Sequence, residues 1–159
     1  MRTGHRNRGF SLLELAVVCG IAALLAAALI SSLLRYQGIA EKEVVDVTVR
    51  QIRNGLRMEV AQLLLQGRQK QVPALVEQNP MLWLGRRPQA YLGEPAAPPA
   101  ADRRGCWYFD PTRKELVYRP QSSAYPGVAE GAELRWKVVP SGSVDAGVKL
   151  VESGSAGGM

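Results

Sequence analysis

The strongest constraint on this chain is an uninterrupted apolar run near its start. The run extends from Phe10 to Leu34, 25 residues in which Glu14 carries the only charge. An α-helix rises ~1.5 Å per residue, so the run would be roughly 37 Å long and could cross the ~30 Å hydrocarbon core of a bilayer with some tilt. The sequence therefore predicts a membrane-spanning helix at residues 10–34.

Basic residues precede this run, namely Arg2, Arg6 and Arg8, with His5 among them. Arginines beside a span stay in the cytoplasm, so we expect the rest of the chain to be exported. A secretory signal peptide also starts with basic residues, but its apolar stretch is shorter and ends at a small-residue cleavage site. Here the alanines at 26–28 lie inside the run, which favours a retained helix over a signal peptide.

The segment Gly9-Phe10-Ser11-Leu12-Leu13-Glu14 resembles the processing site of the type IV pilin-like superfamily, which comprises type IV pilins, minor pilins and type II secretion pseudopilins. The resemblance rests on the basic leader, the glycine before the cut, the acidic fifth residue of the processed chain and the apolar helix that follows. It implies that prepilin peptidase removes residues 1–9 by cutting after Gly9 and then N-methylates Phe10. It also implies that the apolar helix stays in the protein.

Glu14 has two possible explanations. A carboxylate inside a bilayer costs on the order of 3 kcal/mol, and such residues usually have a partner or a function. Glu14 could lie near the cytoplasmic end of the span and reach water with its side chain. Alternatively, as the resemblance implies, it serves assembly. The positive amine of the processed Phe10, one helical turn away in the same subunit or supplied by a neighbour, would then be its partner.

Length and charge limit the exported part. The chain has 159 residues, of which roughly 125 lie beyond the span, enough for one small domain. The formal net charge is +6, but the loss of three leader arginines leaves 17 basic against 14 acidic side chains, a balance of +3. Nucleic-acid binding is therefore an unlikely role. Capture of DNA by a competence-type minor pilin remains an alternative for the basic pairs at 86–87, 103–104 and 113–114.

The span is expected to continue as an amphipathic helix to about Lys70. Gly67 and then Pro73 would end it, and residues 73–78 could form a short second helix. Many pilins have a proline within the apolar run that kinks the helix. This chain has Ser31 at the matching position, so the sequence does not predict whether a kink is present. Apolar residues recur in steps of three and four at Val45, Val49, Ile52, Leu56, Val60, Leu63 and Leu64.

Strand patterns follow a proline-rich loop at 93–101. Residues 106–109 and 115–118 flank the turn-forming 110–113, which predicts a hairpin. Residues 133–138 alternate, and we expect Leu134, Trp136 and Val138 to face the long helix. A short last strand is predicted at 148–151. The sequence thus predicts an α+β fold in which a long N-terminal helix packs on a small antiparallel sheet, with an exported pilin-like domain at 35–152 and a flexible tail at 153–159.

No catalytic constellation is evident. The only histidine is His5, in the predicted leader, so no histidine base is left for a serine or cysteine nucleophile. The acidic residues show no coordinating spacing for a metal. Cys19 lies in the predicted span and Cys106 in the exported domain, so the two should not pair within one chain. We therefore expect no enzyme activity, no metal and no cofactor.

The hypothesis that joins these observations is a structural subunit of a pilus-like filament or a type II secretion pseudopilus. Its expected partners are prepilin peptidase, other pilin-like subunits and an inner-membrane assembly platform. Its expected location is the bacterial inner membrane as a single-pass protein, with a cytoplasmic N-terminus and a periplasmic domain. The alternative from another class is an unprocessed bitopic membrane protein whose periplasmic domain binds a partner.

Overall fold

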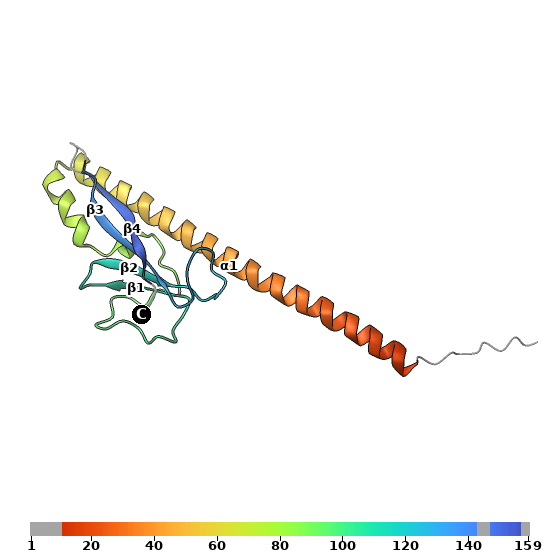
Figure 1. Cartoon of the computed structure of the whole chain (residues 1–159). Coiled ribbons are helices and arrows are strands. Elements are labelled where there is room, and N and C mark those ends of the chain that lie inside the picture. Colours follow the sequence, from red (N-terminus) through yellow and green to blue (C-terminus); the bar gives the residue numbers. More distant parts are fainter. Residues whose placement is uncertain (1–10, 143–146, 157–159) are drawn as a thin grey trace, which may run out of the picture.

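The computed structural model describes residues 11–142 and 147–156, and it consists of one long helix and one small sheet. Helix α1 spans Leu12–Leu65, and two 3-10 helices follow it, η1 at Gln69–Glu77 and η2 at Pro80–Trp83. The strands are β1 (Cys106–Asp110), β2 (Glu115–Arg119), β3 (Glu133–Pro140) and β4 (Val148–Ala156). Figure 1 shows the second half of α1 lying along the sheet, while its first half extends away as a free rod. The predicted α+β fold is confirmed.

Helix α1 is a single helix of 54 residues. No proline interrupts it, and the Ser31 hydroxyl donates a 2.9 Å hydrogen bond to the carbonyl of Ala28 within the helix. At its end Gly67 has a φ of 67°, a left-handed conformation that suits glycine. The amide of Gly67 donates to Leu64 and that of Arg68 to Leu63, which is a Schellman motif. The predicted stop at Gly67 is therefore confirmed.

The sheet is antiparallel throughout, with strand order β1-β2-β3-β4. The hairpin of β1 and β2 pairs Phe109 with Leu116 and Asp110 with Glu115. One carboxylate oxygen of Asp110 accepts the amides of Thr112 and Arg113 at 2.9 and 3.1 Å and fixes the turn. The sequence predicted this hairpin and its turn.

The core lies between α1 and one face of the sheet. Leu134, Trp136 and Val138 of β3 are all buried in it, as predicted. Most of the apolar α1 positions named from the sequence lie in this core. Leu64 was expected on the same apolar face of the helix, but it is 52% exposed, so that prediction was wrong. Neighbouring residues lie about 100° apart around a helix, so Leu63 and Leu64 cannot both face the same core. The buried α1 positions are Val45, Val49, Ile52, Leu56 and Leu63.

Strand β4 is longer than predicted. It was expected to end at Val151, but it pairs with β3 as far as Ala156. The register shifts between Arg135 and Trp136, and Gly154 opposite has a φ of 128°. Residues 153–156 therefore belong to the sheet rather than to the flexible tail that we predicted; residues 157–159 lie outside the described part. The second helix also differs, since η1 begins at Gln69, before Pro73.

Candidate assembly segment and its attachment to the sheet

The predicted cleavage residues Gly9 and Phe10 lie outside the described residues, which begin at Ser11. Ser11 is the N-cap of α1, and its carbonyl accepts the amide of Leu15 at 3.0 Å. Glu14 follows in the first turn and is exposed. A negative side chain is favourable there because the N-terminal end of a helix carries partial positive charge.

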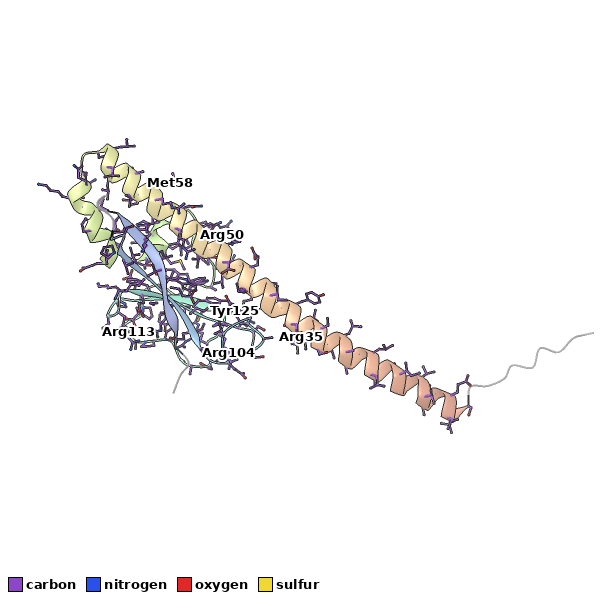
Figure 2. The ribbon with its side chains drawn as sticks, turned by 45° about the horizontal axis from the view of Figure 1, so that its top comes forward. Arg35, Arg50, Met58, Arg104, Arg113 and Tyr125 are labelled. Atoms are coloured by element: carbon purple, nitrogen blue, oxygen red, sulfur yellow. The ribbon has the colours of Figure 1, made fainter. Side chains whose placement is uncertain are left out.

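Within the described residues, no other part of the protein covers the first half of α1. Every residue from 11 to 37 is exposed, including apolar side chains such as Leu12, Leu24 and Leu29, which are 86%, 74% and 72% exposed. Figure 2 shows side chains projecting from this half of the helix, with Arg35 labelled on it. Within the described residues α1 is long and apolar enough to cross a membrane. Such a surface is stable in lipid or against other apolar helices, not in water.

Directly after this exposed half, the loop between β2 and β3 rests on α1. The contact point is Gly38, where a Cβ atom would lie 2.2 Å from the carbonyl oxygen of Ala124. Only glycine allows the loop backbone to approach the helix so closely. The position of the loop on α1 therefore depends on a glycine, which has no side chain, at residue 38.

One turn further along α1, the Glu41 carboxylate holds the same loop. It accepts hydrogen bonds from the Tyr118 hydroxyl at 2.7 Å and from the amides of Gln121 and Ser122 at 2.6 and 2.9 Å. Burial, followed by the hydrogen bond to Glu41, raises the pKa of Tyr118. Glu41 thus joins α1 to the end of β2 at the point where the helix meets the sheet.

The opposite face of the sheet carries a network of charged side chains. Glu133 accepts from Arg119 at 2.6 Å and from Arg135, which also pairs with Glu115 at 3.1 Å. Burial acts to raise the pKa of Glu133, but the hydrogen bond from Arg119 and the charge of Arg135 outweigh it and lower that pKa. Arg119 also donates to the carbonyls of Pro99 and Ala100 and so binds the proline-rich loop to the sheet. These groups pair with one another and form a structural network, in which Arg135 Nε is the one buried side-chain atom of the described residues that has no hydrogen-bond partner.

The described residues contain no group of three side chains suited to a metal ion. Cys19 is exposed on α1, whereas Cys106 is buried, and both are free thiols. Burial raises the pKa of Cys106, which disfavours the reactive thiolate. The arrangement is thus suited to packing and attachment.

The sequence-based assignment of Glu14 stays a prediction, and sequence reasoning missed Gly38 and Glu41. In the sequence, Gly38 is a glycine within a predicted helix, and Glu41 is one charge among several. Their partners lie about eighty positions away in the sequence. A glycine and an acid three residues apart, directly after the apolar run, were the only local signal.

Comparison with known proteins agrees with the N-terminal features. Residues 4–30 match the family model described as the prokaryotic N-terminal methylation motif. No curated protein and no solved structure matches the chain significantly. The match covers the predicted cleavage site, Glu14 and most of the exposed apolar half of α1. Together with that helix, the match supports a prepilin-type, type IV pilin-like protein.

Proposed function

We propose that this protein is a non-enzymatic structural subunit of a type IV pilus-like filament or of a type II secretion pseudopilus. Prepilin peptidase cuts between Gly9 and Phe10 and methylates the new amine of Phe10. The processed chain then assembles with other pilin-like subunits on an inner-membrane platform. The observation that carries the proposal is the methylation motif, which overlaps an uncovered apolar helix.

The geometry of α1 supports this role. From Ser11 to Leu34 it has apolar side chains on all sides and a single charge, Glu14. Lipid covers such a helix before assembly, and helices of other subunits can cover it afterwards. The sheet is attached only to the second half, so the domains of assembled subunits would form the outer surface. Assembly therefore exchanges lipid contacts for helix contacts.

The proposed location follows from charge and length. Arginines in the leader keep the N-terminus in the cytoplasm, and the span places residues 35–152 in the periplasm. The leader, residues 1–9, is lost on processing, and residues 10–34 remain in the inner membrane until assembly.

The decisive experiment is mass spectrometry of the protein's N-terminus from membranes of the source bacterium. The proposal requires a chain that starts at methylated Phe10. Gly9→Leu should abolish cleavage but leave insertion intact, because the span is unchanged. Gly4→Leu, also in the leader, is the matched control and should be cleaved normally.

A native chain that still begins at Met1 would support the alternative, an unprocessed bitopic protein with a periplasmic binding domain. Cleavage of Gly9→Leu at the normal rate would show that the cut lies elsewhere.

A further inference from the structure

A hollow of about 440 Å³ lies between α1 and the loop that follows β2. Its walls are Leu34, Gln37 and Glu41 on the helix and residues 121–123 of the loop. Leu34 is the last residue of the predicted span, so the hollow begins where the apolar run ends. Ligand sites commonly measure roughly 300–1,000 Å³, so the hollow has room for a small polar group.

The position of the hollow on α1 places it at the depth of lipid headgroups. Gly38, on which the loop rests, lies about one turn beyond Leu34, or ~6 Å along the helix axis. The polar layer on each side of the hydrocarbon core is roughly 5–7 Å thick. Arg35 and Tyr36 are exposed, and arginine and tyrosine are residue types that suit this layer. When the span occupies the membrane, the loop therefore lies among headgroups.

The chemistry of the walls favours a cation. Among the described residues that line the hollow, Glu41 carries the only charge, and it forms no ion pair with any described residue. An ionised carboxylate offers about four acceptor positions. The Tyr118 hydroxyl and the amides of Gln121 and Ser122 use three of them, and Oε2 accepts only the amide of Ser122. A primary ammonium group would supply both a further donor and the opposite charge.

We propose that the hollow binds a phospholipid whose headgroup ends in a primary ammonium, as in phosphatidylethanolamine. The ammonium donates to Glu41, and the phosphate, which lies nearer the hydrocarbon, contacts Arg35. Along α1 the arginine precedes the acid, so the two side chains follow the order of phosphate and ammonium in the bilayer. This inference rests on the proposed location, because residues 10–34 must span the membrane. It adds a lipid ligand for the exported domain.

Other common headgroups match the walls less well. An anionic headgroup without an amine would bring only negative charge to Glu41, and like charges repel. A choline headgroup is positive, but its nitrogen carries methyl groups and has no N–H to donate. The site should therefore select the lipid by its ammonium group and not by net charge.

Lipid retention by the full-length chain tests this selection. The chain would be reconstituted into nanodiscs that contain equal amounts of phosphatidylethanolamine, phosphatidylcholine and phosphatidylglycerol with the same acyl chains, and the lipid retained on release would be identified by native mass spectrometry. Phosphatidylethanolamine should be enriched several-fold over the other two. Equal retention of all three would overturn the inference. So would a preference for phosphatidylglycerol, which would indicate attraction to Arg35 alone.

Variants of the walls test the place of binding. Ser123→Trp and Gln37→Trp fill the hollow from the loop and from the helix, and each should abolish the enrichment. Glu41→Gln keeps an acceptor for the loop amides but loses the charge, so it should lower the enrichment. Thr112→Trp, in the exposed turn between β1 and β2, is the matched control and should behave like the native chain. Native enrichment in a Trp variant that circular dichroism shows to be folded would overturn the site.

Fluorescence quenching gives the depth of the loop independently. Bimane on Ser123→Cys, in a chain with Cys19→Ser, should be quenched strongly by phospholipids that carry a nitroxide on the headgroup. The same label on Thr112→Cys should be quenched several-fold less, since Figure 2 shows the adjacent Arg113 on the side of the sheet away from Arg35. Cys106 is buried and does not compete for the label. Equal quenching at the two positions would remove the loop from the headgroup layer and overturn the inference.

The N-terminus of the same chain separates this inference from the proposed function. A chain that begins at methylated Phe10 but shows no lipid preference overturns the lipid site alone. A chain that begins at Met1 and still selects phosphatidylethanolamine overturns the proposed processing and leaves the lipid site standing.

Discussion

The carboxylate of Glu41 on α1 accepts a hydrogen bond of 2.7 Å from the hydroxyl of Tyr118 on β2, although 77 positions separate the two residues. The same carboxylate accepts the amides of Gln121 and Ser122 in the following loop. One side chain thus fixes both a strand end and a loop to the helix, just beyond its uncovered half. Because the apolar half and the domain meet here, this contact sets how the sheet is held relative to the uncovered half of α1.

Removing this carboxylate should weaken the domain. Glu41→Ala leaves one hydroxyl and two amides without their acceptor, and we expect the free energy of unfolding to fall by on the order of 3 kcal/mol. Urea denaturation of the fragment 35–159 would measure it. Glu43→Ala is the control, because its exposed pair with Arg50 is worth at most ~1 kcal/mol. Equal effects of the two substitutions would show that Glu41 is not an attachment point.

Replacing Gly38 with alanine should change the stability of the domain in the direction opposite to the usual one. Glycine to alanine inside a helix normally stabilises by about 1 kcal/mol. At Gly38 the new methyl group would lie 2.2 Å from the Ala124 carbonyl, so Gly38→Ala should instead destabilise by about 1–3 kcal/mol. Thermal denaturation of the same fragment is the measurement, with Gly85→Ala as control, since no atom lies within 4 Å of the added group there. A stabilised Gly38→Ala variant would mean that the loop does not rest on α1.

The sequence predicted what depends on local pattern. The apolar run, the buried face of α1 from Val45 to Leu63 and the hairpin of β1 and β2 follow from periodicities within a few residues. The attachment at Gly38 and Glu41 could not be predicted from local sequence patterns, because the partners of these residues come from a loop about eighty positions later.

The end of β4 was missed for a related reason. Its glycine and serine residues have low strand propensity, but pairing with β3 overrides that preference. In the candidate site, the motif predicted Glu14, whereas tertiary contact alone revealed Glu41.

High pH should destabilise the exported domain. Burial raises the pKa values of Tyr91, Tyr108, Tyr118 and Tyr125, so the unfolded chain releases these protons first, at about pH 10. Their stabilising effect is complete below pH 10 and is lost as the pH rises toward the folded pKa values. Each such proton changes the free energy of unfolding by up to ~1.4 kcal/mol per pH unit. Urea denaturation between pH 8 and about pH 11.5 should show the fall, and constant stability across this range would contradict it.

Trp136 should be essential for the core. It is 4% exposed, and its ring lies 5.3 Å from that of Trp107 between their centroids. Trp136→Ala should cost ~3–5 kcal/mol, enough to unfold a small domain. Circular dichroism melting would report it, with Lys137→Ala as the neighbour on the opposite side of β3. An unchanged melting temperature would place Trp136 outside the core.

Glu14 gives the sharpest prediction for assembly. It carries the only charge between Ser11 and Leu34, and it lies in the first turn of α1. We expect the amine that cleavage would create at Phe10 to be its partner. If that amine belongs to an incoming subunit, the pair would neutralise two charges that are each costly in an apolar filament centre. Glu14→Ala should therefore insert and be cleaved normally but enter the assembly poorly. Incorporation in sheared filaments or cross-linked membrane complexes is the measurement, with Ser11→Ala, in the same turn, as control. Normal incorporation of Glu14→Ala would leave Glu14 as a residue that merely reaches water at the membrane edge.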